Sequence, residues 1–449
     1  MNPHCIHILN RFGFGPKLEW LEKSELSELL NDVTSLKKWL IQTTPTFTES
    51  TKYFKETLNH RKEKLEDEWR KNWEHAAYRV DWLDTMVELD NPIREKAALF
   101  WNHHIPISVD IWPFAQTLLL DCYREHALGN FGDLLKAISA TPCAMKFLNA
   151  YHSCKNAPNQ NYPRELLEIF TMGVGNYNQK EIHEIARAFT GRRTVFPDIW
   201  DIPFPYKMYI DQEQFDNSTK TIFGETGNWN GEDVIDIILK QKQTALHLSK
   251  SILKFYLNEE PDNKHIQETA EFYYQSNYNF TELIEFLMNQ PWFYNIKYSG
   301  NKVKTPIELW IQFQRQLSLR ALTSETTNSL TREFGQIPLH PKNVGGWTSG
   351  IGWLKGQKLS NRLFLPSVLI NISKKDNHLK EKTLGEKISN RIFNRNLLGY
   401  KSDHEIYFNQ EKFMNILNVN KINVTNWLQV KHNNNNLIQL ISHPSYQFN

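Results

Sequence analysis

Apolar residues recur every three or four positions along most of the chain, which is the spacing of amphipathic helices. The pattern predicts helices within 24–42, 91–105, 131–142, 231–257, 279–294 and 435–448. The stretch 51–89 adds many opposite charges three or four residues apart, which favours a long, charged and exposed helical region. These segments predict a mainly α, multi-helix globular fold.

Strand signals are weak and fall in one region. Residues 192–216 are rich in aromatic and β-branched residues and in proline, so we expect a small β-hairpin or an extended flap within 192–225. Residues 334–353 hold seven glycines or prolines, which predicts a long ordered loop of the kind that often serves function. Because no flexible linker divides the sequence, we expect one helical domain over 1–449.

Composition narrows the classes of function. The 449 residues carry 52 basic and 50 acidic side chains, a net charge of +2, so no overall positive field favours nucleic acid. No run approaches the roughly 18 apolar residues of a membrane span. Four cysteines without regular spacing fit reduced thiols. The first residues lack the pattern of a signal peptide, so the expected compartment is the cytoplasm.

The richest polar segment begins at residue 159. Pro163 suits the first turn of a helix, with Asn161 ahead of it as a cap. Arg164, Glu165 and Glu168 follow within one and a half turns. The two glutamates are three residues apart, so a helix places their carboxylates on one face.

A second helix is predicted after a glycine turn, with Asn178 and Glu181 in a capping-box pattern. It carries Glu184 and Arg187 three residues apart. Charges from the two helices could form one centre with three different uses. It could be an acid–base pair, a divalent metal site completed by a histidine, or a structural ion-pair network.

Other candidates are weaker by themselves. His103 and His104 are adjacent, so on a helix they point about 100° apart and cannot both bind one metal. Asp216 and Lys220 lie in an ordinary polar turn. Gly345 and Gly346 precede Trp347 and permit backbone conformations that bring a ring close to a ligand.

Taken in order, these segments resemble the DUF1800 family. The resemblance runs from "HILNRFGFG" through "REKAALFWNHHI", the central segment 159–193, "FDNSTKTIFG" and "KTPIEL" to "HPKNVGGWTSGIGWL" and "ISHPSYQ". It covers about residues 7–447. The positions that match the family's pattern, and that the resemblance marks as site residues, are Arg11, Trp101, His104, Asn161, Arg164, Glu165, Glu168, Glu184, Arg187, Asp216, Lys220 and Trp347.

Two departures weaken a histidine-rich metal site. Asn102 and Phe215 stand where the family usually has histidines. His104, Glu165, Glu168 and Asp216 then form a carboxylate-rich set that suits a hard divalent metal, held by the first three, or no metal at all. The resemblance also implies bacterial proteins that are often exported and encoded beside a DUF1501 protein of phosphatase and sulfatase type. This chain could therefore leave the cell with a signal-bearing partner.

Two functions follow as hypotheses. In the first, the chain is an enzyme with catalytic His104, Glu165, Glu168 and Asp216, acting on an anionic or carbohydrate-like substrate of the cell envelope. The matching cationic, aromatic and polar residues would bind that substrate, namely Arg11, Trp101, Asn161, Arg164, Glu184, Arg187, Lys220 and Trp347. In the second, the chain is a non-catalytic accessory partner of the DUF1501-like protein.

Overall fold

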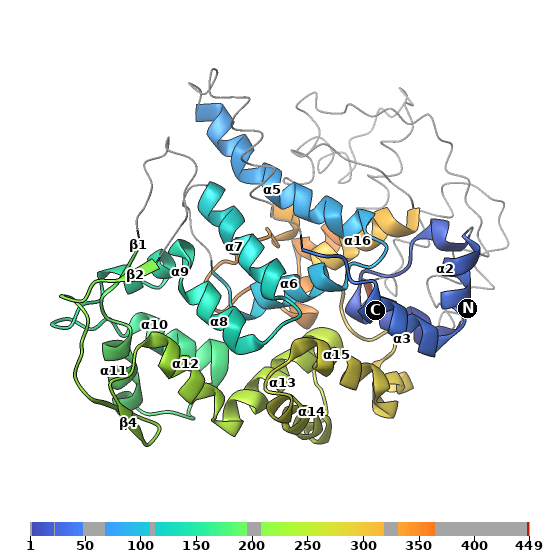
Figure 1. The fold of residues 1–449 in the computed structure, drawn as a ribbon. Helices are drawn as coiled ribbons and strands as arrows, with labels where there is room; N and C mark the ends of the chain where they lie inside the picture. Colours follow the sequence, from blue (N-terminus) through green and yellow to red (C-terminus); the bar gives the residue numbers. More distant parts are fainter. Residues whose placement is uncertain are drawn as a thin grey trace.

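The fold is mainly α, as the sequence predicts. The computed structural model describes residues 2–21, 23–47, 68–107, 113–194, 208–317, 331–363 and 447–448. Helices pack around one large apolar core, and two short antiparallel ladders lie at one end of the molecule (Figure 1). The prediction of a single domain over 1–449 stays a prediction.

The helices that build the core follow one another along the described chain. In order they are α1 (Pro3–Phe12), α2 (Ser24–Leu29), α3 (Val33–Gln42), α5 (Glu68–Glu88), α6 (Ile93–His104), α7 (Pro113–His126), α8 (Phe131–Ser139), α9 (Pro142–Phe147), α10 (Asn161–Glu165), α11 (Gln179–Ala188), α12 (Gly231–Leu239), α13 (Lys242–Tyr256), α14 (Asn263–Gln275), α15 (Phe280–Asn289) and α16 (Pro306–Leu317).

Local capping explains where the predicted helices begin and break. The predicted helix 24–42 is two helices, because the Asp32 side chain accepts the Thr34 N–H at 2.9 Å and starts α3 anew. The stretch 231–257 likewise divides into α12 and α13. Asn91 accepts the Ile93 N–H at the start of α6, at 3.3 Å. The predicted helical residues 51–67 and 435–446 lie outside the described part of the chain.

The predicted flap region holds two small ladders. Strands β1 (Arg192–Thr194) and β2 (Met208–Ile210) pair antiparallel, with Arg192 opposite Ile210. Strands β3 (Lys220–Ile222) and β4 (Glu225–Gly227) form a second antiparallel pair, with Lys220 opposite Gly227. Residues 195–207 of the predicted flap lie outside the described part.

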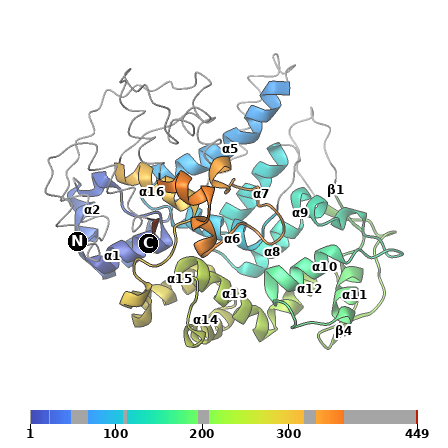
Figure 2. The ribbon, with the colours of Figure 1, turned by 180° about the vertical axis from the view of Figure 1, so that it is seen from behind.

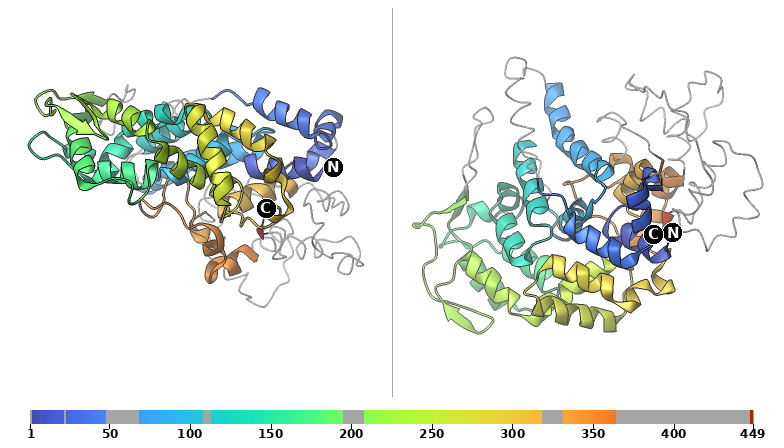
Figure 3. Two further views of the ribbon diagram at one scale, coloured as in Figure 1. Left: turned by 90° about the horizontal axis from the view of Figure 1, so that it is seen from below. Right: turned by 45° about the vertical axis from the view of Figure 1, so that its right-hand side comes forward.

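The ordered loop predicted at 334–353 is present as a series of turns that ends in a short 3₁₀ helix, η6 (Gly350–Leu354). Seen from behind, residues 331–363 (orange) cross the face of the molecule near α6 and α16 (Figure 2). Seen from below, they lie on one side of the layer of helices (Figure 3, left). No helix in the described residues is long and apolar enough to cross a membrane.

Candidate functional site

The central predicted helix contains a π-helical turn. After α10, residues Leu166–Thr171 form the π-helix η3, in which the Met172 N–H reaches the Leu167 carbonyl at 2.9 Å. Asn161 is the first residue of α10 rather than its cap, because the Asn159 side chain accepts the Asn161 N–H at 2.8 Å. π-Turns inside helices occur frequently at functional sites, which directs attention to the side chains here.

Glu165 and Glu168 straddle the start of this turn. Both are half-buried, and neither carboxylate has an ion-pair partner within the described residues. The Tyr177 hydroxyl donates to Glu168 Oε2 at 3.0 Å. Burial raises the pKa of Glu165, the Glu168 charge raises it further, and the exposed Arg164 lowers it. The two carboxylates therefore act on each other electrostatically, as an acid–base pair must.

His104 does not join these carboxylates. Its Nε2 lies 3.0 Å from the Phe170 carbonyl, and Nε2 of His247 lies 2.8 Å from the Ile169 carbonyl. Because a carbonyl only accepts, each ring donates from Nε2. The two rings thus satisfy carbonyls at the end of the π-turn. Burial, followed by the neighbouring His247, lowers the pKa of His104 to about 3.

His247 has no counterpart among the predicted site residues. It lies inside α13, where a single histidine gives no sequence signal. The adjoining turn is built around it, because a Cβ on Gly173 (φ +80°) would lie 2.7 Å from His247 Nδ1. Gly173 is therefore required both for its left-handed backbone and for room beside the ring.

Glu184, Arg187 and Asp216 form one closed network. Arg187 Nη1 donates to both Glu184 oxygens, at 2.9 and 2.8 Å, and Arg187 Nε donates to Asp216 Oδ2 at 2.7 Å. The Thr221 N–H donates to Glu184 at 3.0 Å. Although burial alone would raise it, hydrogen bonds from Arg187 and Ser218 hold the pKa of Asp216 well below its usual range. The network joins α11 to the β3–β4 ladder.

Lys220, the first residue of β3, contacts the backbone of Asp216 beside this network. Its side chain is fully buried, and Nζ donates to the carbonyls of Asp216 and Ser218 at 2.6 and 2.9 Å. Nζ also lies 5.0 Å from the ring centroid of Phe215, the residue that replaces a family histidine. Lys220 thus binds the backbone of its own turn.

Three further predicted residues lie in the core. Trp101 Nε1 donates to the Ala127 carbonyl at 2.8 Å, and the Arg11 guanidinium donates to the Tyr298 carbonyl. Trp347 stacks on His103, with ring centroids 6.1 Å apart and an interplanar angle of 6°. The 334–353 loop therefore contacts His103, on a different face of α6 from the one that carries His104.

A buried ion cluster includes residues that were not predicted. Glu308 accepts from Lys96, and from Lys302 through both oxygens at 3.2 Å. Its Oε2 also accepts the Thr305 N–H at 2.7 Å. All three charged side chains are at most 3% exposed. Lys96 lies in "REKAALFWNHHI" and Glu308 in "KTPIEL", two segments that carry the family resemblance, whereas Lys302 lies outside both.

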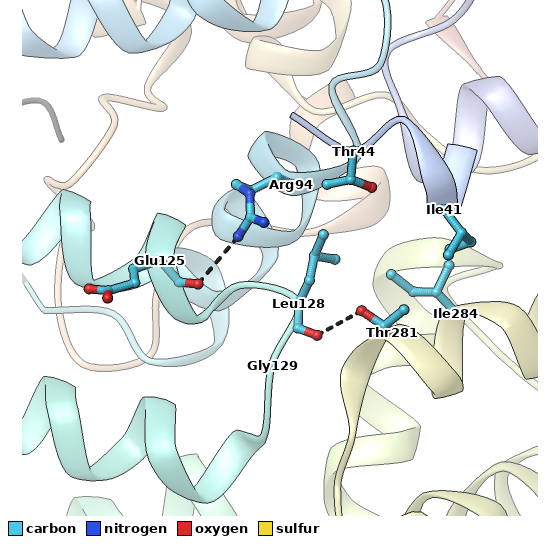
Figure 4. A pocket seen from close by; sticks show the side chains of 8 residues that line it. All are labelled: Ile41, Thr44, Arg94, Glu125, Leu128, Gly129, Thr281 and Ile284. Carbon is cyan, nitrogen blue, oxygen red and sulfur yellow. Dashed lines mark hydrogen bonds between the residues drawn. The ribbon is translucent and has the colours of Figure 1, made fainter. Parts of the chain in front are cut away.

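A pocket of about 330 Å³ lies elsewhere, between α3, α6, α7 and α15 (Figure 4). Arg94 on its wall donates to the Arg124 and Glu125 carbonyls at 3.0 and 3.3 Å. Thr281 donates to the Leu128 carbonyl at 2.7 Å. None of the predicted site residues lines it.

A divalent metal held by His104, Glu165 and Glu168 does not fit this geometry. The described residues contain no group of three or more histidine, cysteine, aspartate or glutamate side chains placed to hold a metal ion. His104 directs Nε2 at a backbone carbonyl rather than at either glutamate.

One of three comparisons with known proteins identifies a family. The family model described as "Protein of unknown function (DUF1800)" matches residues 7–446, nearly the whole chain. This confirms the resemblance drawn from the sequence segments. The search of curated proteins and the search of solved structures each find no match.

Proposed function

We propose that the chain, which belongs to the DUF1800 family, is an enzyme that uses Glu165 and Glu168 as an acid–base pair. The proposed substrate is an anionic or carbohydrate-like molecule of the cell envelope. The observation that carries the proposal is the position of two half-buried carboxylates at a π-turn, without a cationic partner in the described residues.

The contrast with the other predicted charges supports this choice. Glu184 and Asp216 both bind Arg187, and Lys220 binds backbone carbonyls. These groups are occupied in holding α11 against the β3–β4 ladder. Desolvating a carboxylate without pairing it costs stability, and such a cost is a common mark of a residue kept for chemistry.

Each carboxyl group has a separate role in the proposal. Glu165, whose pKa is raised, would carry a proton and donate it to the leaving oxygen. Glu168, which accepts from Tyr177, would take a proton from the attacking water. The exposed Arg164 offers a guanidinium beside the pair, suited to a carboxylate or sulfate group on the substrate.

The test is release of product from three probes, namely a uronic-acid polysaccharide, a sulfated polysaccharide and a neutral glucan, followed by mass spectrometry. Glu165→Gln and Glu168→Gln should each lower the rate about 10²- to 10⁴-fold. Glu213→Gln, at an exposed site, should leave it unchanged. Equal rates for Glu165→Gln and the control would refute the site. No release from any probe would refute the substrate class.

A second candidate is a non-catalytic accessory role beside a DUF1501-like protein. The closed Arg187 network favours it, because its charges pair with one another and hold α11 against the β3–β4 ladder. Co-purification with the neighbouring protein, unchanged in Glu165→Gln and Glu168→Gln, would support this role. Absence of a complex between that protein and the wild-type chain would oppose it.

A further inference from the structure

Positive charge is concentrated around a single buried carboxylate beneath the 334–353 loop. Glu308 is 2% exposed, and five cationic side chains that are each at most 3% exposed act on it electrostatically. We call this group the basic centre: Arg11, Lys96, Lys302, Lys304 and Arg362 around Glu308.

In the part of the chain that the structure describes, Lys96, Lys302 and Arg362 act on one fully buried carboxylate, that of Glu308. Lys96 and Lys302 share Glu308, and Arg362 adds a third cation. The other acid acting on the centre, Glu259, is only half-buried. Burying a cation without a counter-charge is unfavourable. Burial lowers the pKa of Lys96 to about 8, so its ammonium form still predominates at neutral pH.

The loop places tryptophans beside this charge. Trp347 and Trp353 pack on Val303, which lies between Lys302 and Lys304 in the sequence. Within the described residues, the buried donors Trp347 Nε1, Trp353 Nε1 and Arg362 Nη1 have no acceptor. Buried donors are normally satisfied. Buried positive charge and N–H donors that are unpaired among the described residues therefore occur together beneath the 334–353 loop.

The loop is built to lie close on this region. A Cβ on Gly346 (φ +79°) would lie 2.9 Å from the His103 carbonyl oxygen, and one on Gly350 (φ +51°) would lie 2.6 Å from Glu259 Cδ. Only glycine combines these left-handed conformations with such close approach. His103 and Glu259, the partly exposed residues beneath the loop, mark the edge of the region.

We propose that the basic centre binds an oxyanion group of a small-molecule ligand, a phosphate, sulfate or carboxylate. Lys302 and Arg362 supply the charge, and the Trp347 N–H supplies a neutral donor. An oxyanion offers negative charge for the buried cations and several acceptor oxygens for the donors that have no partner among the described residues. The site is separate from Glu165 and Glu168 and does not depend on their role.

The test is calorimetric titration of inorganic phosphate, sulfate and acetate into the purified full chain. The buffer is held at pH 7 and constant ionic strength with chloride. Saturable binding of one of the probes at a single site is expected. Preference for phosphate or sulfate assigns a tetrahedral anion, and preference for acetate assigns a carboxylate.

Two variants and a control locate the binding. Lys302→Met should weaken it about 10- to 100-fold, as expected for a charged hydrogen bond. Trp347→Phe keeps a ring but removes the N–H, and should weaken it several-fold. Trp292→Phe removes an indole whose N–H donates to Glu268 at 3.0 Å, and should change nothing.

The contrary results are equally specific. Absence of binding for all three probes would overturn the proposal. So would binding that is unchanged in both Lys302→Met and Trp347→Phe, since the anion would then lie elsewhere. If Lys302→Met fails to fold, Trp347→Phe against Trp292→Phe decides the question alone.

Discussion

Replacing Glu308 with glutamine should destabilise the protein strongly at neutral pH. Glu308 accepts hydrogen bonds from Lys96, Lys302 and the Thr305 N–H, and it is 2% exposed. The variant keeps the volume and one acceptor oxygen but leaves two ammonium groups buried without their carboxylate. Breaking a buried pair in this way costs about 3–5 kcal/mol, a large part of an ordinary stability of about 5–15 kcal/mol.

The pH dependence of this loss is a second signature. Although burial alone would raise it, Lys302 and Lys96 hold the pKa of Glu308 well below its usual range. Its stabilisation is therefore fully present above the unfolded value and is lost only in acid. Burial lowers the pKa of Lys96 to about 8, against 10.5 unfolded. Because Glu308 raises that pKa, Lys96 in Glu308→Gln should lose its proton below pH 8, so the penalty should diminish as the pH rises towards 8.

Urea unfolding followed by circular dichroism measures the effect, from the midpoint and the slope of the transition. The matched control is Glu225→Gln, since Glu225 pairs with Lys240 at the surface, with side chains 34% and 60% exposed. That pair should contribute no more than about 0.5 kcal/mol. A loss below about 1 kcal/mol in Glu308→Gln, or one equal to the control, would refute the reasoning.

Three further predictions concern other charges of the site. Asp216→Asn should lower the free energy of unfolding by about 1–3 kcal/mol at pH 7, because it weakens the hydrogen bond to Arg187. Since the pKa of Asp216 is depressed in the folded chain, this loss, measured by urea unfolding, should shrink below about pH 4. A loss that does not change with pH would contradict this prediction. The pKa of His104 is lowered to about 3, so below pH 6 this residue alone should reduce stability by about 1.4 kcal/mol per pH unit as the pH falls; the slope measured for His104→Asn should be smaller than that of wild type by this amount, and an equal slope would contradict it. Carbon-13 NMR titration should find the Glu165 pKa above its usual range, and Glu168→Gln should lower it; an unchanged value would show that the two carboxylates do not interact.

The helical fold and its small ladders were predictable because they follow from local pattern. Helical periodicity located most of the described helices, and the capping box of Asn178 and Glu181 is formed as expected. The break between α12 and α13 was missed, because an unbroken amphipathic pattern runs through Lys240 and Gln241. The backbone leaves the helix between Leu239 and Lys242 although the apolar spacing continues.

The candidate site was predictable only where its partners are close in sequence. Glu184 and Arg187 are three residues apart, and their ion pair is present. The other partner of Arg187, Asp216, is 29 residues away, and which side chains it meets depends on how the β3–β4 ladder packs. The pair of Lys96 and Glu308 spans 212 residues, so no local pattern could reveal it.

The role of His104 depends on tertiary packing in the same way. On α6 the adjacent histidines face different neighbours, His103 towards Trp347 and His104 towards the Phe170 carbonyl. The helical angle between them was predictable, but the π-turn that receives His104 was not. The turn leaves carbonyls that only residues from two other helices, α6 and α13, can satisfy.

Whether Glu165 and Glu168 are kept for chemistry or for structure is decided most directly by the unfolding free energy of Glu165→Gln relative to wild type. Burial and the Glu168 charge outweigh Arg164 and raise the pKa of Glu165, so the ionised carboxylate is disfavoured in the folded chain and the variant should be as stable as wild type or slightly more stable. Glu308→Gln in the same experiment supplies the scale of a structural loss. A fall of about 3 kcal/mol or more in Glu165→Gln would contradict the proposed acid–base pair and make Glu165 part of the scaffold.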